Sequence, residues 1–256
     1  MCGIVAAAAS KNIVPVLVEG LKRLEYRGYD SAGLAVISAA GIERVRSVGR
    51  VAELETASAS TRSVTGIAHT RWATHGVPSE RNAHPHVSGS IAVVHNGIIE
   101  NYESLRNELS ARGHVFTSDT DTESIAHLIE ATLQTAPDLF AAVRLACRRL
   151  VGAYAIAVID HQQPGKVIVA REGSPLLLGL SDTGNYAASD ASALLQVTRN
   201  MVYLENGDIA ELTATGVNIT RLDGTPVDHP VHVSQLSAAA VELGNYQHYM
   251  QKEIFE

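Results

Sequence analysis

Cysteine is scarce in this sequence, with only Cys2 and Cys147 among 256 residues. Two cysteines so far apart provide no disulfide framework, and such scarcity is typical of proteins from a reducing compartment. Cys147 falls on the apolar stripe of an expected helix over residues 138–150, where a thiol serves as a small buried hydrophobic group. Cys2 therefore has to be explained separately.

Long apolar runs and clusters of basic residues are also absent. No segment reaches the roughly 18 apolar residues that a membrane span requires, and the apolar start of the chain has no basic segment before it. With a net charge of -7 and a pI near 5.9, the chain lacks the Lys and Arg clusters that neutralise nucleic-acid phosphates. We therefore expect a cytoplasmic protein that binds no nucleic acid and is not associated with a membrane.

The distribution of apolar residues predicts layers of sheet and helix. The chain is 46% hydrophobic and 18% charged, as in an ordinary globular protein, and its length suits one domain. The spacing of apolar residues predicts strands at both ends of the chain and helices in the middle. This order favours antiparallel sheets with helical layers, an α/β sandwich, over a doubly wound parallel sheet.

The expected strands cover residues 3–8, 33–37, 63–70, 90–95, 154–160, 166–170, 176–180 and 202–211. The expected helices cover residues 13–24, 102–113, 122–133 and 138–150. Pro15 would lie in the first turn of the first helix, where proline is tolerated. The strands after residue 153 would form a second sheet. Asn96 and Gly97 follow the strand over residues 90–95 and are typical of a turn.

Cys2 places a nucleophile and a base on one residue once Met1 has been removed, and its small side chain allows that removal. The free α-amine has an ordinary pKa of about 7.7 to 8.0 and the thiol one of about 8.5, so proton transfer between them is nearly balanced. Activation by an N-terminal amine is a recognised alternative to a Ser-His pair. Cysteine at position 2 also occurs by chance, so other residues have to support a catalytic role.

Dense polar clusters lie beside the expected strands, at residues 26–33, 69–76 and 95–97. Such clusters are costly in a core, whereas loops at strand ends are where rigid folds hold binding and catalytic groups. Arg71 offers a planar fork for a carboxylate and Asp121 a charge for an ammonium group, which together would recognise a free amino acid. The Asn96 amide and Gly97 N–H can donate to an oxyanion, although Asn-Gly also occurs in plain hairpins.

Six ordered motifs resemble those of the class II glutamine amidotransferases, in particular the glutaminase domain of the glucosamine-6-phosphate synthases. They are MCGIV at residues 1–5, YRGYDSAG at 26–33, HTRWATHG at 69–76, NAHPH at 82–86, HNGIIEN at 95–101 and TDTE at 120–123. The resemblance spans nearly the whole chain. Related amidotransferases that make phosphoribosylamine or asparagine generally lack the tyrosine after YRG and the tryptophan of HTRWATHG.

The resemblance implies an α+β fold, the four-layer αββα sandwich of the N-terminal-nucleophile hydrolases, with no cofactor and no metal. Cys2 would attack the side-chain amide of L-glutamine while its α-amine relays the proton, and Asn96 and Gly97 would stabilise the oxyanion. Arg71 and Asp121 would hold the α-carboxylate and the α-ammonium group. Ammonia and glutamate would be the products.

The same resemblance implies further site residues. Trp72, Thr74 and His75 would shape the pocket and its covering loop. Three residues of matching motifs receive supporting roles only: Arg27, His84 and His86.

Residues 2–240 would form the glutaminase domain, and residues 241–256 would begin the linker toward a sugar-phosphate isomerase domain. In the full-length enzyme, expected to be a homodimer, that domain would use the ammonia to convert fructose 6-phosphate to glucosamine 6-phosphate. The chain alone is expected to act as a plain glutaminase, and to be inactive while Met1 is attached. Ala6 stands where the family usually has glycine, and we expect a small packing adjustment there.

Three alternatives stay open. The protein could bind glutamine without hydrolysing it, or its ammonia could serve a nucleotide or aspartyl precursor. Histidines could instead form a metal site, although Pro85 between two of them indicates a turn. Those histidines are His69, His75, His84, His86 and His95.

Overall fold

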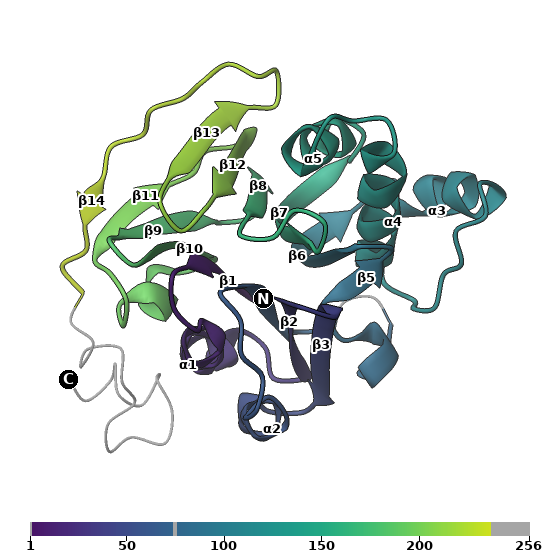
Figure 1. The fold of residues 1–256 in the computed structure, drawn as a ribbon. Helices are drawn as coiled ribbons and strands as arrows, with labels where there is room; N and C mark the ends of the chain where they lie inside the picture. Colours follow the sequence, from purple (N-terminus) through teal and green to yellow (C-terminus); the bar gives the residue numbers. More distant parts are fainter. Residues whose placement is uncertain (1, 74–75, 237–256) are drawn as a thin grey trace.

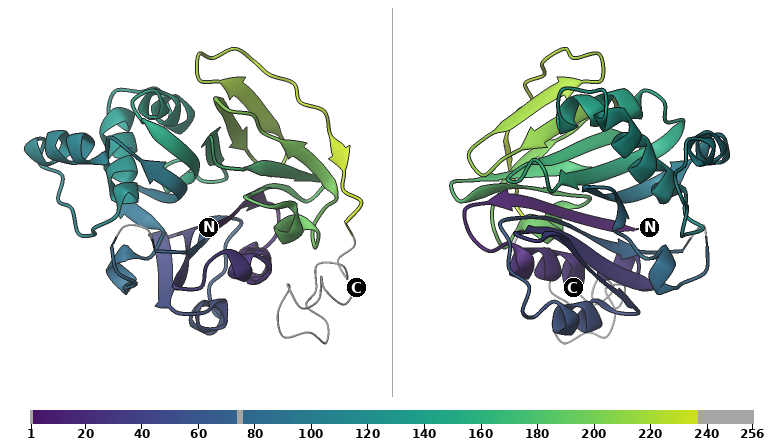
Figure 2. Two further views of the ribbon diagram at one scale, coloured as in Figure 1. Left: turned by 180° about the vertical axis from the view of Figure 1, so that it is seen from behind. Right: turned by 45° about the vertical axis from the view of Figure 1, so that its right-hand side comes forward.

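The computed structural model describes residues 2–73 and 76–236. In this part of the chain the strands form two stacked antiparallel sheets, and helices cover the outer face of each (Figure 1, Figure 2). The layer order is helix, sheet, sheet, helix. The four-layer αββα sandwich expected from the sequence is therefore confirmed.

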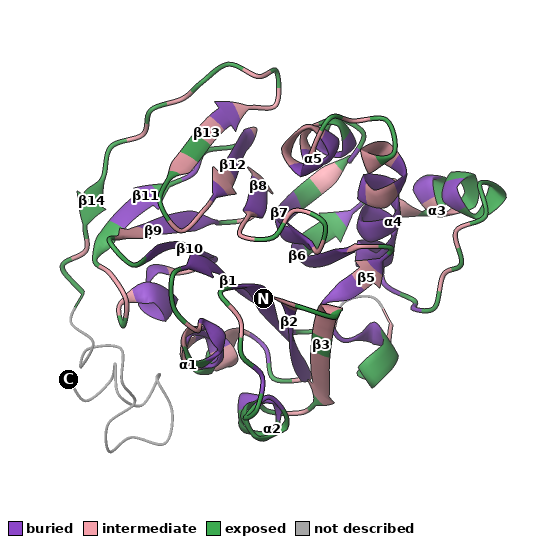
Figure 3. Ribbon diagram, in the orientation of Figure 1, coloured by how far each residue is buried: buried purple, intermediate pink, exposed green. Residues whose placement is uncertain are grey.

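The first sheet has the strand order β14-β11-β9-β10-β1-β4-β2-β3. β1 lies in its interior between β10 and β4, and it is buried along its whole length (Figure 3). The bounds are β1 Gly3–Ala9, β2 Ser31–Ser38, β3 Gly41–Val48, β4 Thr65–Arg71, β9 Leu177–Ser181, β10 Gly184–Ala188, β11 Asn200–Tyr203 and β14 His232–Val233.

The second sheet has the strand order β13-β12-β8-β7-β6-β5. Its long central hairpin pairs β6 with β7 from Ile91 opposite Asp160 to Ile99 opposite Gly152. The bounds are β5 His86–Ser88, β6 Ile91–Ile99, β7 Gly152–Asp160, β8 Val167–Glu172, β12 Asp208–Leu212 and β13 Val217–Arg221.

Each sheet buries its outer face under helices. Helices α1 (Val14–Leu24) and α2 (Val51–Ala57) cover the first sheet, and α3 (Tyr102–Ala111), α4 (Asp121–Leu133) and α5 (Leu139–Cys147) cover the second. Short 3-10 turns are η1 Glu25–Arg27, η2 Glu80–Asn82 and η3 Ala191–Leu194. In α1 the side chains of Leu17, Leu21 and Leu24 are fully buried, and Pro15 lies in the first turn as predicted.

Small side chains fill the layer between the two sheets. Alanines from both sheets, including Ala6, Ala8, Ala35, Ala92 and Ala157, are fully buried in one cluster with larger aliphatic residues. The extra methyl of Ala6 therefore lies in the centre of the sandwich. Alanine neighbours give it room without displacing β1, which keeps a continuous register with β4 and β10.

Two strand predictions were wrong, and the first of them concerns residues of the site. Asn96 and Gly97 do not form a turn: β6 runs straight through them to Ile99, because β7 pairs with it over that whole length. The run over residues 202–211 is not one strand. It divides at residues 204–207 into β11 and β12, which belong to different sheets.

Other differences concern the extent of elements. The strands after residue 153 do not form a sheet of their own, since β9, β10, β11 and β14 join β1 in the first sheet. Helix α5 ends at Cys147 rather than residue 150, and Asp138 caps its start by accepting a hydrogen bond from the Ala141 N–H at 2.8 Å. β3 and α2 were not predicted. Charged residues interrupt the apolar spacing in both, because β3 is an edge strand and α2 a surface helix.

Candidate active site

Cys2 lies immediately before β1, beside the end of β4. Its Sγ accepts a hydrogen bond from the Trp72 backbone N–H at 3.3 Å and lies 3.6 Å from the Trp72 carbonyl oxygen. Trp72 follows β4 directly, and β4 pairs with β1 with Gly3 opposite Thr70. This register places the thiol next to the Arg71–Trp72 segment.

The YRGYDSAG motif supports that segment. A Cβ at Gly28 would lie 2.8–2.9 Å from backbone atoms of Arg71 and Trp72, so the close approach requires glycine. The Asp30 N–H donates to the Arg71 carbonyl oxygen at 3.1 Å, and Asp30 Oδ2 accepts from the Ala73 N–H at 2.7 Å. The motif thereby fixes the backbone that contacts the thiol.

Asn96 and Gly97 reach Cys2 from the second sheet. Asn96 Nδ2 donates to the carbonyl oxygen of Cys2 at 3.1 Å. Gly97 has a φ of +129°, and a Cβ there would collide with the carbonyl oxygen of Ala153 on β7. Glycine tolerates this backbone conformation and other residues do not. The two residues expected as oxyanion donors therefore both lie at the thiol, within a strand rather than a turn.

The two charged residues expected to bind an amino acid also lie at Cys2. Arg71 and Asp121 are buried, with relative exposures of 4% and 5%, and with Cys2 they line a small cavity of about 20 Å³. Arg71 Nη2 donates to the Gly76 carbonyl oxygen at 3.0 Å, and Asp121 Oδ2 accepts from the Ile99 N–H at 2.9 Å. Opposite charges thus face one cavity beside the thiol.

A wider cavity of about 230 Å³ shares the thiol with the first. Cys2, Trp72 and Gly97 line both. Its other lining residues are Arg27, Asn96, Ile98, Ser174 and Pro175. The thiol therefore lies where a narrow charged cavity meets a wider one.

Burial raises the pKa of the Cys2 thiol, and the hydrogen bond from the Trp72 N–H and the nearby positive charges oppose that shift only in part. Near neutral pH the thiol therefore keeps its proton unless a neighbouring base removes it. By contrast Cys147 is buried against Tyr154 in the second sheet, and burial raises the pKa of its thiol to about 12. The prediction that Cys147 is a buried packing residue is confirmed.

A group of buried histidines lies behind the site. The rings of His69 and His84 are 4.1 Å apart and those of His84 and His86 are 5.0 Å apart, measured between centroids. Burial lowers the pKa of His69 and of His86 to about 3 and that of His84 well below its ordinary value, so all three are neutral near pH 7. The expectation that the cluster over residues 69–76 stays out of the core is wrong for His69, because a neutral imidazole with hydrogen-bond partners can be buried.

The histidine rings make hydrogen bonds rather than a ligand cage. His86 Nε2 lies 2.9 Å from Thr120 Oγ1, and His95 Nδ1 lies 3.0 Å from Thr122 Oγ1. Within residues 2–73 and 76–236, no group of three or more His, Cys, Asp or Glu residues is arranged to hold a metal ion. These contacts weigh against the metal-site alternative for the histidines that the structure describes.

The remaining predicted residues differ in where they lie. Arg27 lines the wider cavity and forms an ion pair with Asp190 at 2.5 Å. His84 lines the narrow cavity, whereas His86 lines neither cavity. Thr74 and His75 lie outside the described residues.

The sequence did not single out Ser174 and Pro175, which line the wider cavity from the loop between β8 and β9. A Gly-Ser-Pro run after a strand is a turn signal, so the loop itself was predictable. Its position at the same cavity as Trp72 depends on how the sheets stack, which no local pattern encodes.

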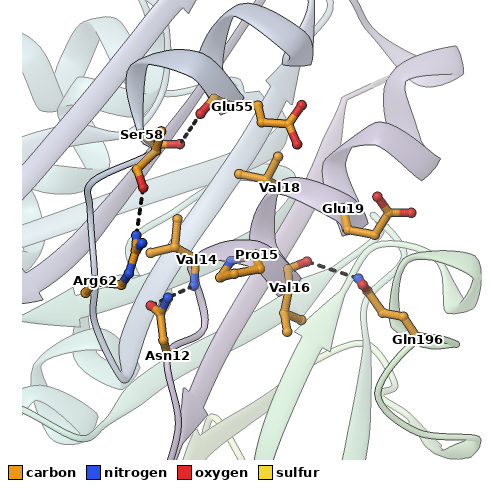
Figure 4. Close-up of a pocket in the computed structure, with 11 residues that line it drawn as sticks. Asn12, Val14, Pro15, Val16, Val18, Glu19, Glu55, Ser58, Arg62 and Gln196 are labelled. Atoms are coloured by element: carbon orange, nitrogen blue, oxygen red, sulfur yellow. Dashed lines mark hydrogen bonds between the residues drawn. The ribbon is translucent and has the colours of Figure 1, made fainter.

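A hollow of about 530 Å³ lies elsewhere, on the helical face between α1 and α2 (Figure 4). Its lining is mixed in polarity, and Gln196 Nε2 at its rim donates to the Val16 carbonyl oxygen at 3.1 Å. Cys2 and the residues around it do not line this hollow. Among the residues that the structure describes, no helix is both long enough and apolar enough to cross a membrane.

Curated relatives resemble the whole of this chain. The chain is 59% identical over 261 residues to glutamine--fructose-6-phosphate aminotransferase [isomerizing] of Acidithiobacillus ferridurans, of which it spans 43%. It is 53% identical over 259 residues to the enzyme of the same name from Xylella fastidiosa, of which it spans 42%. The chain thus spans about two fifths of the length of the curated relatives it matches.

Solved structures share the fold. Glutamine phosphoribosylpyrophosphate amidotransferase from B. subtilis superimposes with a TM-score of 0.74 at 25% identity, over 86% of this chain and 49% of that one. A class-II glutamine aminotransferase domain protein from Silicibacter pomeroyi gives a TM-score of 0.60 at 16% identity, over 86% and 99%, and shows the fold alone. A family model described as "Glutamine amidotransferase domain" matches residues 69–196, which hold Arg71, Asn96, Gly97 and Asp121. The chain therefore belongs to the class II glutamine amidotransferase family.

Proposed function

We propose that the chain hydrolyses L-glutamine to L-glutamate and ammonia, with the thiol of Cys2 as nucleophile. One observation carries the proposal: the Asn96–Gly97 pair lines the wider cavity, the charged pair Arg71 and Asp121 lines the narrow one, and the thiol lines both. Nucleophile, oxyanion donors and binding groups for a free amino acid are then all within reach of one substrate.

Recognition of the substrate follows from the charges. The planar fork of Arg71 matches a carboxylate and the Asp121 carboxylate matches an ammonium group. Both groups are buried, which strengthens their interaction with a bound charge. Trp72, half exposed beside the thiol, would shape the pocket around the side chain of glutamine, and Thr74 and His75 would belong to its covering loop.

The chemistry needs a free α-amine on Cys2. The thiol gives its proton to that amine as Sγ attacks the amide carbon, and the oxyanion forms between the Asn96 amide and the Gly97 N–H. The C–N bond then breaks, the ammonium group returns the proton to the leaving nitrogen, and ammonia departs. Water hydrolyses the thioester, which releases glutamate and restores the thiol. With Met1 attached the amine is an amide, so this base is lost.

The use of the ammonia is inferred from the relatives. Those that match the whole chain are named as aminotransferases of fructose 6-phosphate, at 52–59% identity, whereas the phosphoribosylpyrophosphate enzyme is 25% identical. We therefore propose glucosamine 6-phosphate as the product of the full-length enzyme, a cytoplasmic homodimer. In it, residues 2–240 are the glutaminase domain and residues 241–256 begin the linker to a sugar-phosphate isomerase domain. The predicted linker lies wholly within residues 237–256, which are outside the described part.

The proposal is tested by labelling and by substitution. A diazoketone analogue of glutamine should add once to the processed protein, at Cys2 and not at Cys147, as measured by intact mass and peptide mapping. Cys2→Ala should abolish ammonia release and labelling while the thermal unfolding temperature changes little. Glutamine binding without ammonia release by the processed wild type would instead identify a non-catalytic glutamine-binding protein, and an active Cys2→Ala protein would refute the nucleophile.

A further inference from the structure

His69 contacts Asn96 on the side away from the thiol. Its Nε2 lies 3.0 Å from Asn96 Oδ1 and also 3.0 Å from the backbone carbonyl oxygen of His95. His69 extends from β4 in the first sheet and Asn96 from β6 in the second, so this contact bridges the two sheets directly behind the site. Both side chains are more than nine-tenths buried.

The partners of Nε2 determine which ring nitrogen carries the proton. A backbone carbonyl oxygen can only accept a hydrogen bond, so Nε2 must donate to His95. A donating Nε2–H then requires an acceptor from Asn96, which is the amide oxygen. The amide nitrogen is thereby turned to the opposite side, where Nδ2 donates to the Cys2 carbonyl oxygen at 3.1 Å.

The opposite orientation of Asn96 would be unproductive. It would bring the amide NH₂ against the N–H of His69 and present Oδ1 to the position of the developing oxyanion. An oxygen there repels the negative charge that the site has to stabilise. An asparagine supplies an oxyanion donor only in one of its two amide orientations, and among the described residues the groups that discriminate between them are His69 and the Cys2 carbonyl.

We propose that His69 is a positioning residue, whose Nε2–H holds the Asn96 amide with its nitrogen toward Cys2 and so toward the oxyanion. This inference rests on the proposed glutaminase function. His69 touches neither cavity, so its effect on the reaction passes through Asn96. Such a residue acts on the transition state and leaves the binding of glutamine unchanged.

The first test is the kinetics of His69→Leu in the processed protein, measured as ammonia release. Loss of one oxyanion donor typically costs about 10²- to 10³-fold in kcat. In His69→Leu the Asn96 amide is still present but can rotate, so the loss in kcat should be somewhat smaller. We expect kcat to fall by about 10- to 100-fold while KM for glutamine changes less than about threefold. His69→Gln keeps a donor at the place of Nε2 and should recover most of the activity. The matched control is His127→Leu, which removes another buried histidine but leaves kcat unchanged.

A double-mutant cycle separates positioning from general damage. If His69 acts through Asn96, His69→Leu should lower kcat no further in an Asn96→Ala protein, whereas an independent structural effect should be multiplicative. If His69→Leu does not fold, the tautomer of the His69 ring is measured in the wild-type protein instead. Nitrogen NMR of His69 should show Nε2 protonated and Nδ1 not.

Several results would overturn the inference: full kcat in His69→Leu, multiplicative losses in the cycle, no recovery by His69→Gln, or an Nδ1–H tautomer. Wild-type protein that releases no ammonia would instead contradict the proposed function. The two failures are therefore distinguishable.

Discussion

At the scale of single residues, the candidate site was largely predictable because its chemistry depends on side-chain types in fixed order. Cys2, Arg71, Asn96, Gly97 and Asp121 were selected from the sequence, and all five lie around the same cavities. What could not be predicted is which residues hold them in place. His69 belongs to a predicted motif, yet its contact with Asn96 depends on the stacking of two sheets.

Arg71 gives a test of substrate recognition at this scale. Arg71→Lys keeps a positive charge but loses the planar fork and the hydrogen bond from Nη2 to the Gly76 carbonyl oxygen. We expect KM for glutamine to rise about 10- to 100-fold with a smaller change in kcat, since the lost contacts bind ground state and transition state alike. Steady-state ammonia release checks this. A variant with normal KM and a lowered kcat would show that Arg71 does not hold the substrate carboxylate.

At the scale of elements, strand register brings the site together. β1, β4 and β6 each contribute a segment, and the pairing of β1 with β4 sets Cys2 against Trp72. The sequence predicted these strands but misjudged Asn96–Gly97 as a turn, because Asn-Gly is a local signal and the pairing with β7 that overrides it is not local. Edge elements such as β3 were missed for the related reason that solvent-facing charges mask their apolar spacing.

The alanine of β1 provides a test of packing. Ala6→Gly removes a buried methyl group and adds a flexible residue to a strand interior, so the free energy of unfolding should fall by about 1 to 2 kcal/mol. The kcat should stay within about twofold of wild type, because Ala6 does not displace Cys2 from its contacts. Urea unfolding and ammonia release measure the two, with exposed Ala39→Gly as control. A large gain in kcat would mean that the methyl of Ala6 disturbs the site.

At the scale of the whole molecule, the sandwich buries several imidazoles, and this makes its stability depend on pH. Burial holds the pKa of His69 and His86 at about 3, against an ordinary value of about 6.5 in an unfolded chain. Between these values the unfolded chain binds more protons than the folded one. The contribution of these neutral histidines to the stability of the folded protein is therefore fully present above about pH 6.5. It is lost as the pH falls toward 3.

As the pH is lowered from 6 to 4, we expect the free energy of unfolding to decrease by about 1.4 kcal/mol per pH unit for each such histidine. Urea unfolding at several pH values measures this slope. His69→Gln should make the slope shallower by about one histidine's contribution. Equal slopes for wild type and His69→Gln would show that His69 titrates normally in the folded protein.

The central claim, that the amine of Cys2 serves as the base for its own thiol, is tested most directly by fusing a protease-removable leader to Cys2. One preparation is then assayed for ammonia release before and after the leader is cut, with intact mass confirming a free Cys2 α-amine. The account predicts at least about a 100-fold rise in glutamine hydrolysis on cleavage, with little change in thermal unfolding. Equal turnover before and after cleavage would contradict it.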